Sequence, residues 1–199
     1  MFVPVSLAIA DEIRWVLEKC YSNPWLPLTG EKNRNTAGCA TSIEDLVKLP
    51  SSLLGTRHVQ AFSANMPVEA AAVSEQPRRR YAITALHRIV PTASSGDGES
   101  SEMVTCHDMT YPYVVFYCHM AGPATRAYMV VLVSEVSGSA EPATMEVVSV
   151  CHLDMTQWSP KHPFLQEQHA KPGDVEACHF LPKSSIVWVP SWSKENAVL

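Results

Sequence analysis

The chain has 199 residues, of which 46% are hydrophobic, and a formal net charge of −5. This length and composition are those of a globular protein with one substantial core. The acidic balance argues against a nucleic-acid-binding protein, which needs a basic surface. The lack of an 18-residue apolar run argues against a membrane-spanning segment.

The first part of the chain predicts two helices. Residues 6–20 carry apolar side chains at three-to-four residue spacing, which is typical of an amphipathic helix. Residues 41–54 predict the second helix, because Thr41 and Glu44 have the spacing of a capping box. Pro50 is expected to interrupt this helix, and Gly55 follows its expected end.

Beyond the second helix the chain changes to short runs that are rich in β-branched and aromatic residues. Two segments of low complexity, residues 91–101 and 137–144, are expected to be loops. An α+β fold follows, with N-terminal helices packed on a mostly antiparallel sheet in a single domain. The expected strands are residues 59–63, 81–90, 113–119, 127–134, 145–152 and 186–189.

A dipeptide of cysteine and histidine occurs four times in the second half of the chain. The pairs are Cys106-His107, Cys118-His119, Cys151-His152 and Cys178-His179. They are separated by ten residues (108–117), 31 residues (120–150) and 25 residues (153–177). Zinc knuckles place their ligands two to four residues apart, so the pairs must converge from different strands.

The strand setting separates the roles within each pair. Successive side chains on a strand point to opposite faces, so the sulfurs are expected on one face and the imidazoles on the other. This favours disulfides from the cysteines and a metal site from the histidines, with copper and zinc as candidates. Each ligating imidazole needs a partner on the nitrogen that does not bind the metal. Asp108, close to the first pair, and Asp154, close to the third, are candidate partners. Two structural disulfides beside exposed histidines are the alternative.

The four pairs resemble the signature of the plant BURP domain. Residues 113–119 (YVVFYCH) and 151–162 (CHLDMTQWSPKH) are similar to its YxVFYCH and CHxDTSxWxPxH segments. Residues 177–190 (ACHFLPKSSIVWVP) and 39–44 (CATSIE) are similar to its CHxLPxxxxVWVP and CATSxE segments. The likeness covers nearly the whole chain and implies one BURP-like domain over residues 1–199, with the four pairs in residues 106–179.

The resemblance implies a plant protein of the secretory pathway, in the apoplast or another extracellular space, or in the vacuole. Some BURP proteins resemble structural or stress-associated proteins, and one group is the non-catalytic β subunit of a cell-wall polygalacturonase. Others are copper-dependent cyclases of ribosomally made peptides (RiPP biosynthesis). These use O2 to link a Tyr or Trp side chain to another residue of a core peptide.

The sequence departs from the family pattern in three places. The second gap is longer than usual, with residues 137–144 as the expected insertion, and the region before Cys20 is short. No repeated core peptide precedes the domain in this sequence. We therefore expect a copper-dependent oxidative cyclase that acts on a separate peptide, with a non-enzymatic wall- or stress-associated scaffold as the alternative.

The resemblance and the strand pattern together give the candidate site residues. His107, His119, His152 and His179 are the expected copper ligands, and they would be catalytic through that metal. His162 is a fifth candidate, with a hydrogen bond to a backbone turn after Pro160 as an equal alternative.

Three further residues have candidate roles. Asp154 could orient a ligand or act as a base, but a cap on the turn at Thr156 is the more common role. Tyr117 and Trp158 are the candidate contacts for a peptide substrate, although most such aromatic residues belong to the core.

All six cysteines are expected to form disulfides. Cys20 and Cys39 flank a turn-rich loop and are expected to pair with each other. The alternative is that each pairs with a cysteine of the repeated dipeptide. Cys106, Cys118, Cys151 and Cys178 are expected to form two disulfides, with their connectivity open among three arrangements.

Overall fold

The structure is a computed structural model that describes residues 7–22, 37–66, 80–89, 102–122, 124–135, 142–156 and 158–191. Its contacts divide the chain into two compact units. Unit 1 contains Met1–Ala61, Glu102–Ala121 and Ser184–Leu199, and unit 2 contains Phe62–Ser101 and Gly122–Lys183. The single domain over residues 1–199 stays a prediction. The described residues contain no helix that is long and apolar enough to cross a membrane.

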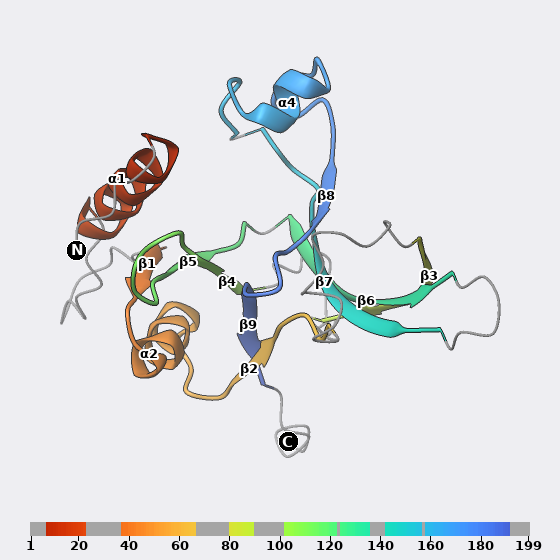
Figure 1. Cartoon of the computed structure of the whole chain (residues 1–199), viewed down its shortest axis with the longest axis horizontal. Helices are drawn as coiled ribbons and strands as arrows, with labels where there is room; N and C mark the ends of the chain where they lie inside the picture. Colours follow the sequence, from red (N-terminus) through yellow and green to blue (C-terminus); the bar gives the residue numbers. More distant parts are fainter. Residues whose placement is uncertain are drawn as a thin grey trace, which may run out of the picture. The chain divides into compact units, whose positions relative to one another are not determined.

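Unit 1 is built around a five-stranded sheet with the order β1-β5-β4-β9-β2. The β1/β5, β4/β5 and β4/β9 pairs are antiparallel. The strands, labelled in Figure 1, are β1 (Ala37–Ala40), β2 (Val59–Phe62), β4 (Val104–Asp108), β5 (Phe116–Met120) and β9 (Ile186–Pro190).

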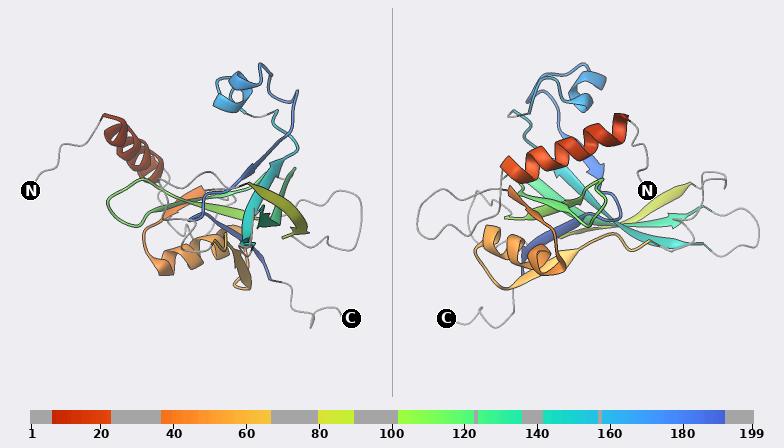
Figure 2. Two further views of the ribbon diagram at one scale, coloured as in Figure 1. Left: turned by 45° about the vertical axis from the view of Figure 1, so that its right-hand side comes forward. Right: turned by 60° about the vertical axis from the view of Figure 1, so that its left-hand side comes forward.

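Helix α2 (Ile43–Leu54) covers one face of this sheet, as Figure 2 shows. Its leucines face strands that contribute apolar and sulfur-bearing side chains, and burial of this surface is the main force that holds the layer together. The buried residues of this core are Ala40, Leu49, Leu53, Leu54, Val104, Cys106, Cys118 and Trp188.

The ends of α2 correct the expected capping pattern. The N-cap is Ser42, whose hydroxyl accepts a hydrogen bond from the Asp45 N–H at 3.0 Å, so the predicted Thr41 capping box is wrong by one residue. The predicted interruption at Pro50 is also wrong, because Pro50 lies buried within a helix that continues to Leu54. Gly55 ends the helix in the left-handed conformation, with φ of 68°, which glycine adopts without strain.

The position of the cap gives a stability prediction. Replacing Ser42 with alanine removes the acceptor of the Asp45 N–H and is expected to lower the free energy of unfolding by about 1 kcal/mol. Urea unfolding measures this loss. Thr41→Ala is the matched control, because Thr41 is exposed and lies outside the cap. Equal losses in the two variants would contradict the assignment of the cap.

Helix α1 (Leu7–Ser22) confirms the amphipathic helix that the N-terminal spacing predicts. The Cys20–Cys39 disulfide joins it to β1, as expected, and the Trp15 ring lies 6.4 Å from the Tyr117 ring. Its apolar stripe is only partly covered. Val16 is buried, whereas Ile9 and Leu17 are 44% and 50% exposed. The disulfide and the contact of Trp15 with Tyr117 therefore attach this helix to the sheet of unit 1.

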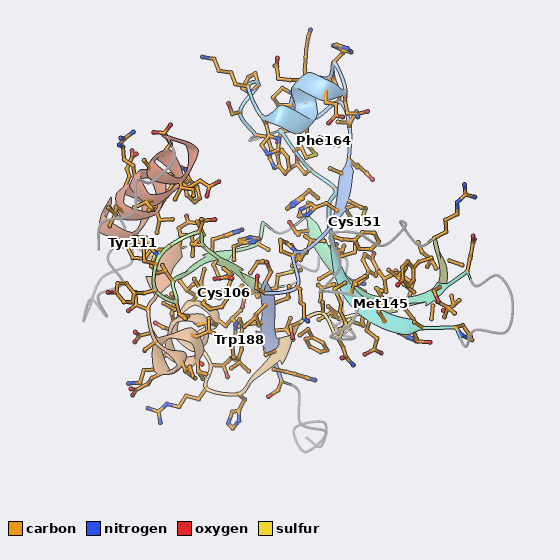
Figure 3. All side chains as sticks on the ribbon, viewed as in Figure 1. Cys106, Tyr111, Met145, Cys151, Phe164 and Trp188 are labelled. Carbon is orange, nitrogen blue, oxygen red and sulfur yellow. A yellow bond between two sulfur atoms is a disulfide. The ribbon has the colours of Figure 1, made fainter. Side chains whose placement is uncertain are left out.

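Unit 2 contains a four-stranded antiparallel sheet with the order β3-β6-β7-β8. Its strands are β3 (Tyr81–Arg88), β6 (Thr125–Ser134), β7 (Thr144–His152) and β8 (Ala177–Phe180). One small core lies on the sheet around Val130, Met145 and Val147, and Figure 3 labels Met145 within it.

Residues 153–176 connect β7 to β8 and have a small core of their own. We call this segment the α4 lobe, because it contains the short helix α4 (Pro163–Glu167). Met155 and Leu165 are fully buried in its core, together with Ala177 at the start of β8. Phe164, labelled in Figure 3, packs against them.

The α+β fold is confirmed, although the strands form two sheets and the prediction missed four elements. The expected strands of residues 59–63, 81–90, 127–134, 145–152 and 186–189 match β2, β3, β6, β7 and β9. Strand β5 begins at Phe116 rather than Tyr113. The missed elements are β1, β4, β8 and α4. Residues 91–101 and 137–141 of the expected loops lie outside the described residues.

Candidate functional site

The repeated dipeptides meet in two places, which we call Cys-His clasps. Clasp 1 comprises Cys106, His107, Cys118 and His119 in unit 1, and clasp 2 comprises Cys151, His152, Cys178 and His179 in unit 2. Each clasp joins two neighbouring antiparallel strands. The chain thus contains the same local arrangement twice.

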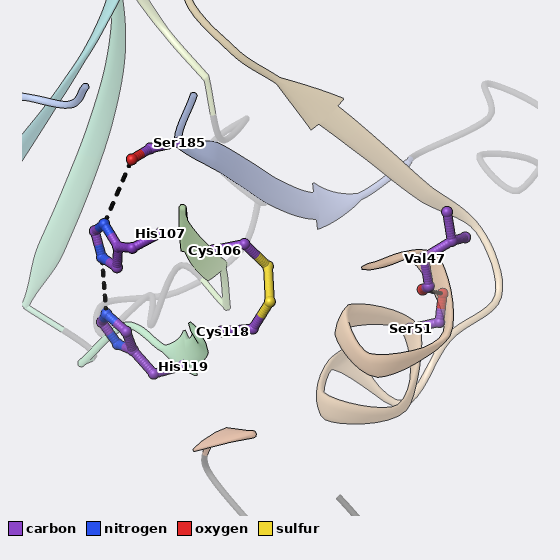
Figure 4. Close-up of a disulfide and its surroundings, with 7 residues drawn as sticks. All are labelled: Val47, Ser51, Cys106, His107, Cys118, His119 and Ser185. Carbon is purple, nitrogen blue, oxygen red and sulfur yellow. Dashed lines mark hydrogen bonds between the residues drawn. A yellow bond between two sulfur atoms is a disulfide. The ribbon is translucent and has the colours of Figure 1, made fainter. Parts of the chain in front are cut away.

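Clasp 1 lies on strands β4 and β5. Cys106 is directly opposite Cys118 in the strand register, and the two form a disulfide. Both cysteines are fully buried in the core beneath α2. The imidazoles of His107 and His119 emerge on the other face of the strands, as Figure 4 shows. This separation of sulfurs and imidazoles is the one predicted from the alternation of side chains along a strand.

The two imidazoles of clasp 1 point toward each other. Their Nε2 atoms are 3.2 Å apart, and the rings are stacked with centroids 5.3 Å apart. In the register His107 faces Tyr117 and His119 faces Thr105, so the two histidines are diagonal neighbours. Diagonal side chains on one face of a sheet are within reach of each other when they are long or aromatic.

Clasp 2 repeats this arrangement on strands β7 and β8. Cys151 is directly opposite Cys178, and the two form a disulfide. The Nε2 atoms of His152 and His179 are 3.4 Å apart, and the ring centroids are 5.5 Å apart. The surroundings differ, because Cys151 is half-buried and Cys178 is exposed. The disulfide of clasp 2 is therefore more accessible than that of clasp 1.

Main-chain carbonyls fix the ring orientation of one histidine in each clasp. The Nδ1 atom of His119 lies 3.1 Å from the carbonyl oxygen of Met120, and that of His179 lies 3.3 Å from the carbonyl oxygen of Phe180. A carbonyl oxygen only accepts, so each Nδ1 carries the proton and each neutral ring keeps a lone pair on Nε2. These carbonyls are partners of the second and fourth histidines. The sequence suggested Asp108 and Asp154 for the first and third pairs, and that role stays a prediction.

Burial favours the neutral form of His119. Removal from water lowers the pKa of His119, and the Met120 carbonyl opposes this shift with a smaller effect. The unprotonated Nε2 atom of this ring is therefore available over a wider pH range than in an ordinary histidine.

Comparison with known proteins identifies the family. Residues 1–190 match the BURP domain. The chain belongs to the BURP domain family. It is 49% identical over 203 residues to BURP domain-containing protein 11 of Oryza sativa subsp. japonica, which covers 96% of this chain and 60% of that protein. The resemblance inferred from the repeated dipeptides is thus confirmed, and it is a resemblance to plant proteins.

Other BURP relatives share less sequence. BURP domain-containing protein 9 of Oryza sativa subsp. japonica is 40% identical over 197 residues, which is 99% of this chain and 34% of that protein. Protein RAFTIN 1A of Triticum aestivum is 33% identical over 159 residues, which is 80% of this chain and 36% of that protein. The chain therefore spans between about a third and three fifths of the length of these curated relatives.

The donor set of each clasp fits a metal ion that prefers nitrogen ligands. Two imidazole nitrogens bound at about 2.0 Å to one tetrahedral metal lie about 3.3 Å apart. The Nε2 separations of 3.2 Å and 3.4 Å agree with this distance. Imidazole suits both copper and zinc. Among the described residues, no place gathers three or more His, Cys, Asp or Glu side chains that could hold a metal. Each clasp by itself thus offers two nitrogen ligands.

One aromatic ring contacts an imidazole in each clasp. The Tyr117 ring lies 5.8 Å from that of His119, and the Trp158 ring lies 5.0 Å from that of His152. Both residues were the candidate contacts for a substrate. Their place beside the clasps is compatible with that role, which stays a prediction.

His162 and Asp154 both cap backbone turns of unit 2. The Nδ1 atom of His162 accepts a hydrogen bond from the Phe164 N–H at 3.3 Å, at the start of α4, and its ring lies 4.3 Å from Trp158. Asp154 accepts from the Thr156 N–H at 2.9 Å, and this hydrogen bond lowers its pKa. These are the turn and cap roles that the sequence offered as alternatives to metal ligation and base catalysis.

Two buried serines contact the clasps and were missed in the sequence. Ser185 is 1% exposed, and its Oγ lies 3.5 Å from Nδ1 of His107 (Figure 4). Ser149 is 8% exposed, and its hydroxyl donates to the main-chain carbonyl of His179 at 3.2 Å. Ser149 stands two residues before Cys151, so alternation on β7 places both on one face. Nothing local in the sequence connects Ser185 with His107, 78 residues away.

Proposed function

We propose that this BURP chain is a copper-dependent oxidative peptide cyclase that acts on a separate, ribosomally made peptide. The observation that supports it most is the pair of Nε2 atoms in each clasp, at about the spacing of two nitrogens on one tetrahedral metal ion. His107 and His119 would hold copper in clasp 1, and His152 and His179 would hold it in clasp 2. Copper with O2 supplies the oxidation that removes hydrogen from a Tyr or Trp side chain of the peptide.

The protein's own contribution is to position ligands and substrate. The cross-strand disulfides hold the two strands of each clasp in register, so each imidazole pair is arranged before the metal arrives. The carbonyls of Met120 and Phe180 keep a lone pair on Nε2 of His119 and His179. Tyr117 and Trp158 offer ring surfaces beside the clasps on which an aromatic peptide side chain can pack. The peptide loses two hydrogens when its new cross-link forms, and O2 takes up these two protons and two electrons.

The activity is tested with copper-loaded protein, O2 and peptides that contain Tyr or Trp. A peptide product two hydrogens lighter is expected by mass spectrometry, because each cross-link removes one hydrogen from each joined atom. His107→Ala is expected to reduce product formation strongly. His87→Ala is the control, since His87 is an exposed residue of β3. Unchanged peptide mass across such peptides, with copper bound, would contradict the cyclase.

The alternative is a non-enzymatic wall- or stress-associated scaffold. It is favoured by the disulfides, which use all six cysteines, and by the two-ligand donor set of each clasp among the described residues. Failure of the protein to retain copper through dialysis would support the scaffold over the enzyme.

Both functions place the chain in an oxidising compartment. Three disulfides are typical of secreted proteins and are rare in the cytosol. We propose that the chain passes through the secretory pathway to the apoplast or the vacuole.

A further inference from the structure

Four polar groups form a continuous line through clasp 1. Ser185 Oγ lies 3.5 Å from Nδ1 of His107, and Nε2 of His107 lies 3.2 Å from Nε2 of His119. Nδ1 of His119 in turn lies 3.1 Å from the carbonyl oxygen of Met120. Figure 4 shows the serine and the two imidazoles of this line.

The carbonyl at the end of the line determines the protons in the metal-free protein. The Met120 carbonyl only accepts, so His119 carries its proton on Nδ1 and has a lone pair on Nε2. A second lone pair 3.2 Å away would be repelled, so His107 must carry its proton on Nε2 and donate it to His119. Nδ1 of His107 is then an acceptor, and the Ser185 hydroxyl donates to it.

Metal binding requires the opposite arrangement at His107. Each imidazole must present a lone pair on Nε2 to the metal, so His107 moves its proton to Nδ1. That Nδ1–H faces the buried side chain of Ser185, and a donor that is shielded from water and has no acceptor costs about 1–3 kcal/mol. A hydroxyl is both a donor and an acceptor, whereas a carbonyl only accepts. Ser185 is 1% exposed, so water is largely excluded from its side chain.

We infer that Ser185 is a positioning residue of clasp 1, whose hydroxyl changes from donor to acceptor when His107 exchanges its hydrogen bond to His119 for a metal ion. This inference rests on metal binding by clasp 1, which the proposed function requires. The observation that supports the inference is the contact between Ser185 Oγ and Nδ1 of His107. Ser149 in unit 2 contacts the main chain of His179 and not its ring.

The tautomer of His107 is measured directly by 15N NMR, which separates protonated from bare ring nitrogens. In the metal-free protein the proton of His107 is expected on Nε2, and that of His119 on Nδ1. Addition of Zn(II), which is diamagnetic and binds imidazole, is expected to move the His107 proton to Nδ1. A His107 that already carries its proton on Nδ1 without metal would overturn the inference, whatever the activity of the protein.

Copper affinity provides the second readout. Ser185→Ala is expected to weaken Cu(II) binding at clasp 1 by about 10–100-fold, the usual effect of losing a partner of a ligating histidine. Ser185→Thr keeps the hydroxyl and is expected to restore the affinity. Ser134→Ala is the matched control, because it removes a buried hydroxyl of β6 that accepts from the Ala143 N–H and lies outside both clasps.

These outcomes separate the inference from the proposed function. Wild-type copper affinity in Ser185→Ala would overturn the role of Ser185 and leave the cyclase intact. Cu(II) and Zn(II) that fail to bind the wild-type protein would overturn the proposed metal site, and with it the acceptor role of Ser185. If Ser185→Thr does not fold, as shown by its thermal unfolding, the 15N tautomers of the wild-type protein and the affinity of Ser185→Ala still decide.

Discussion

His119→Ala is expected to weaken Cu(II) binding at clasp 1 by more than a hundredfold. Loss of a residue that only supports a ligand costs about 10–100-fold, and His119 is proposed as a ligand itself. In the wild-type protein the Nε2 atoms of His107 and His119 lie 3.2 Å apart. The variant keeps only the imidazole of His107 at this place. The fold should persist, because the disulfide behind the pair is untouched and lies on the opposite face of the strands.

Competition with a chelator of known copper affinity measures this loss. His179→Ala makes the corresponding change in clasp 2, and His87→Ala removes an exposed histidine of β3 outside both clasps. His87→Ala should bind copper as the wild-type protein does. Equal copper affinity in His119→Ala and His87→Ala would contradict metal binding by clasp 1.

Removal of the buried Cys106–Cys118 disulfide is expected to lower the free energy of unfolding more than removal of the Cys151–Cys178 disulfide. The cysteines of Cys106–Cys118 are 12 residues apart, and a cross-link over such a loop contributes about 3 kcal/mol by restricting the unfolded chain. Both sulfurs also belong to the core beneath α2, so the double variant Cys106→Ala/Cys118→Ala loses packing as well. Alanine is used rather than serine, because serine would place an unsatisfied hydroxyl in this core.

The disulfide of clasp 2 is the matched comparison. Cys151 and Cys178 are 27 residues apart, but Cys178 is exposed, so Cys151→Ala/Cys178→Ala loses the cross-link with little core packing. Urea unfolding is expected to show a larger loss for the clasp 1 variant, although its loop is shorter. An equal or reversed order would show that loop length outweighs burial.

The clasps could be predicted in part because strand alternation is a local rule. The run YVVFYCH indicated a strand that ends in a Cys-His pair, and alternation alone placed Cys118 and His119 on opposite faces. Which pairs meet was not predictable, because this depends on the register of β4 with β5 and of β7 with β8. Strands β4 and β8 were both missed, because neither has a run of β-branched and aromatic residues like YVVFY before its pair.

The remaining errors have similar causes. Strand β1 (AGCA) consists of small residues with weak strand preference, and its pairing with β5 supplies the stabilisation that the sequence lacks. Pro50 was expected to break α2, but burial of Leu49, Leu53 and Leu54 offsets the loss of one hydrogen bond. Ser185 was unpredictable because its contact with His107 depends on the pairing of β9 with β4.

The α4 lobe has a consequence for how this protein can vary. The Cys151–Cys178 disulfide locks β7 to β8 at the point where the lobe leaves the sheet, and the lobe is stabilised by its own core around Met155 and Leu165. The alignment of His152 with His179 is therefore set by the strand register and the disulfide rather than by the length of the connection. We therefore expect the connection between β7 and β8 to tolerate changes in length without displacing the histidines.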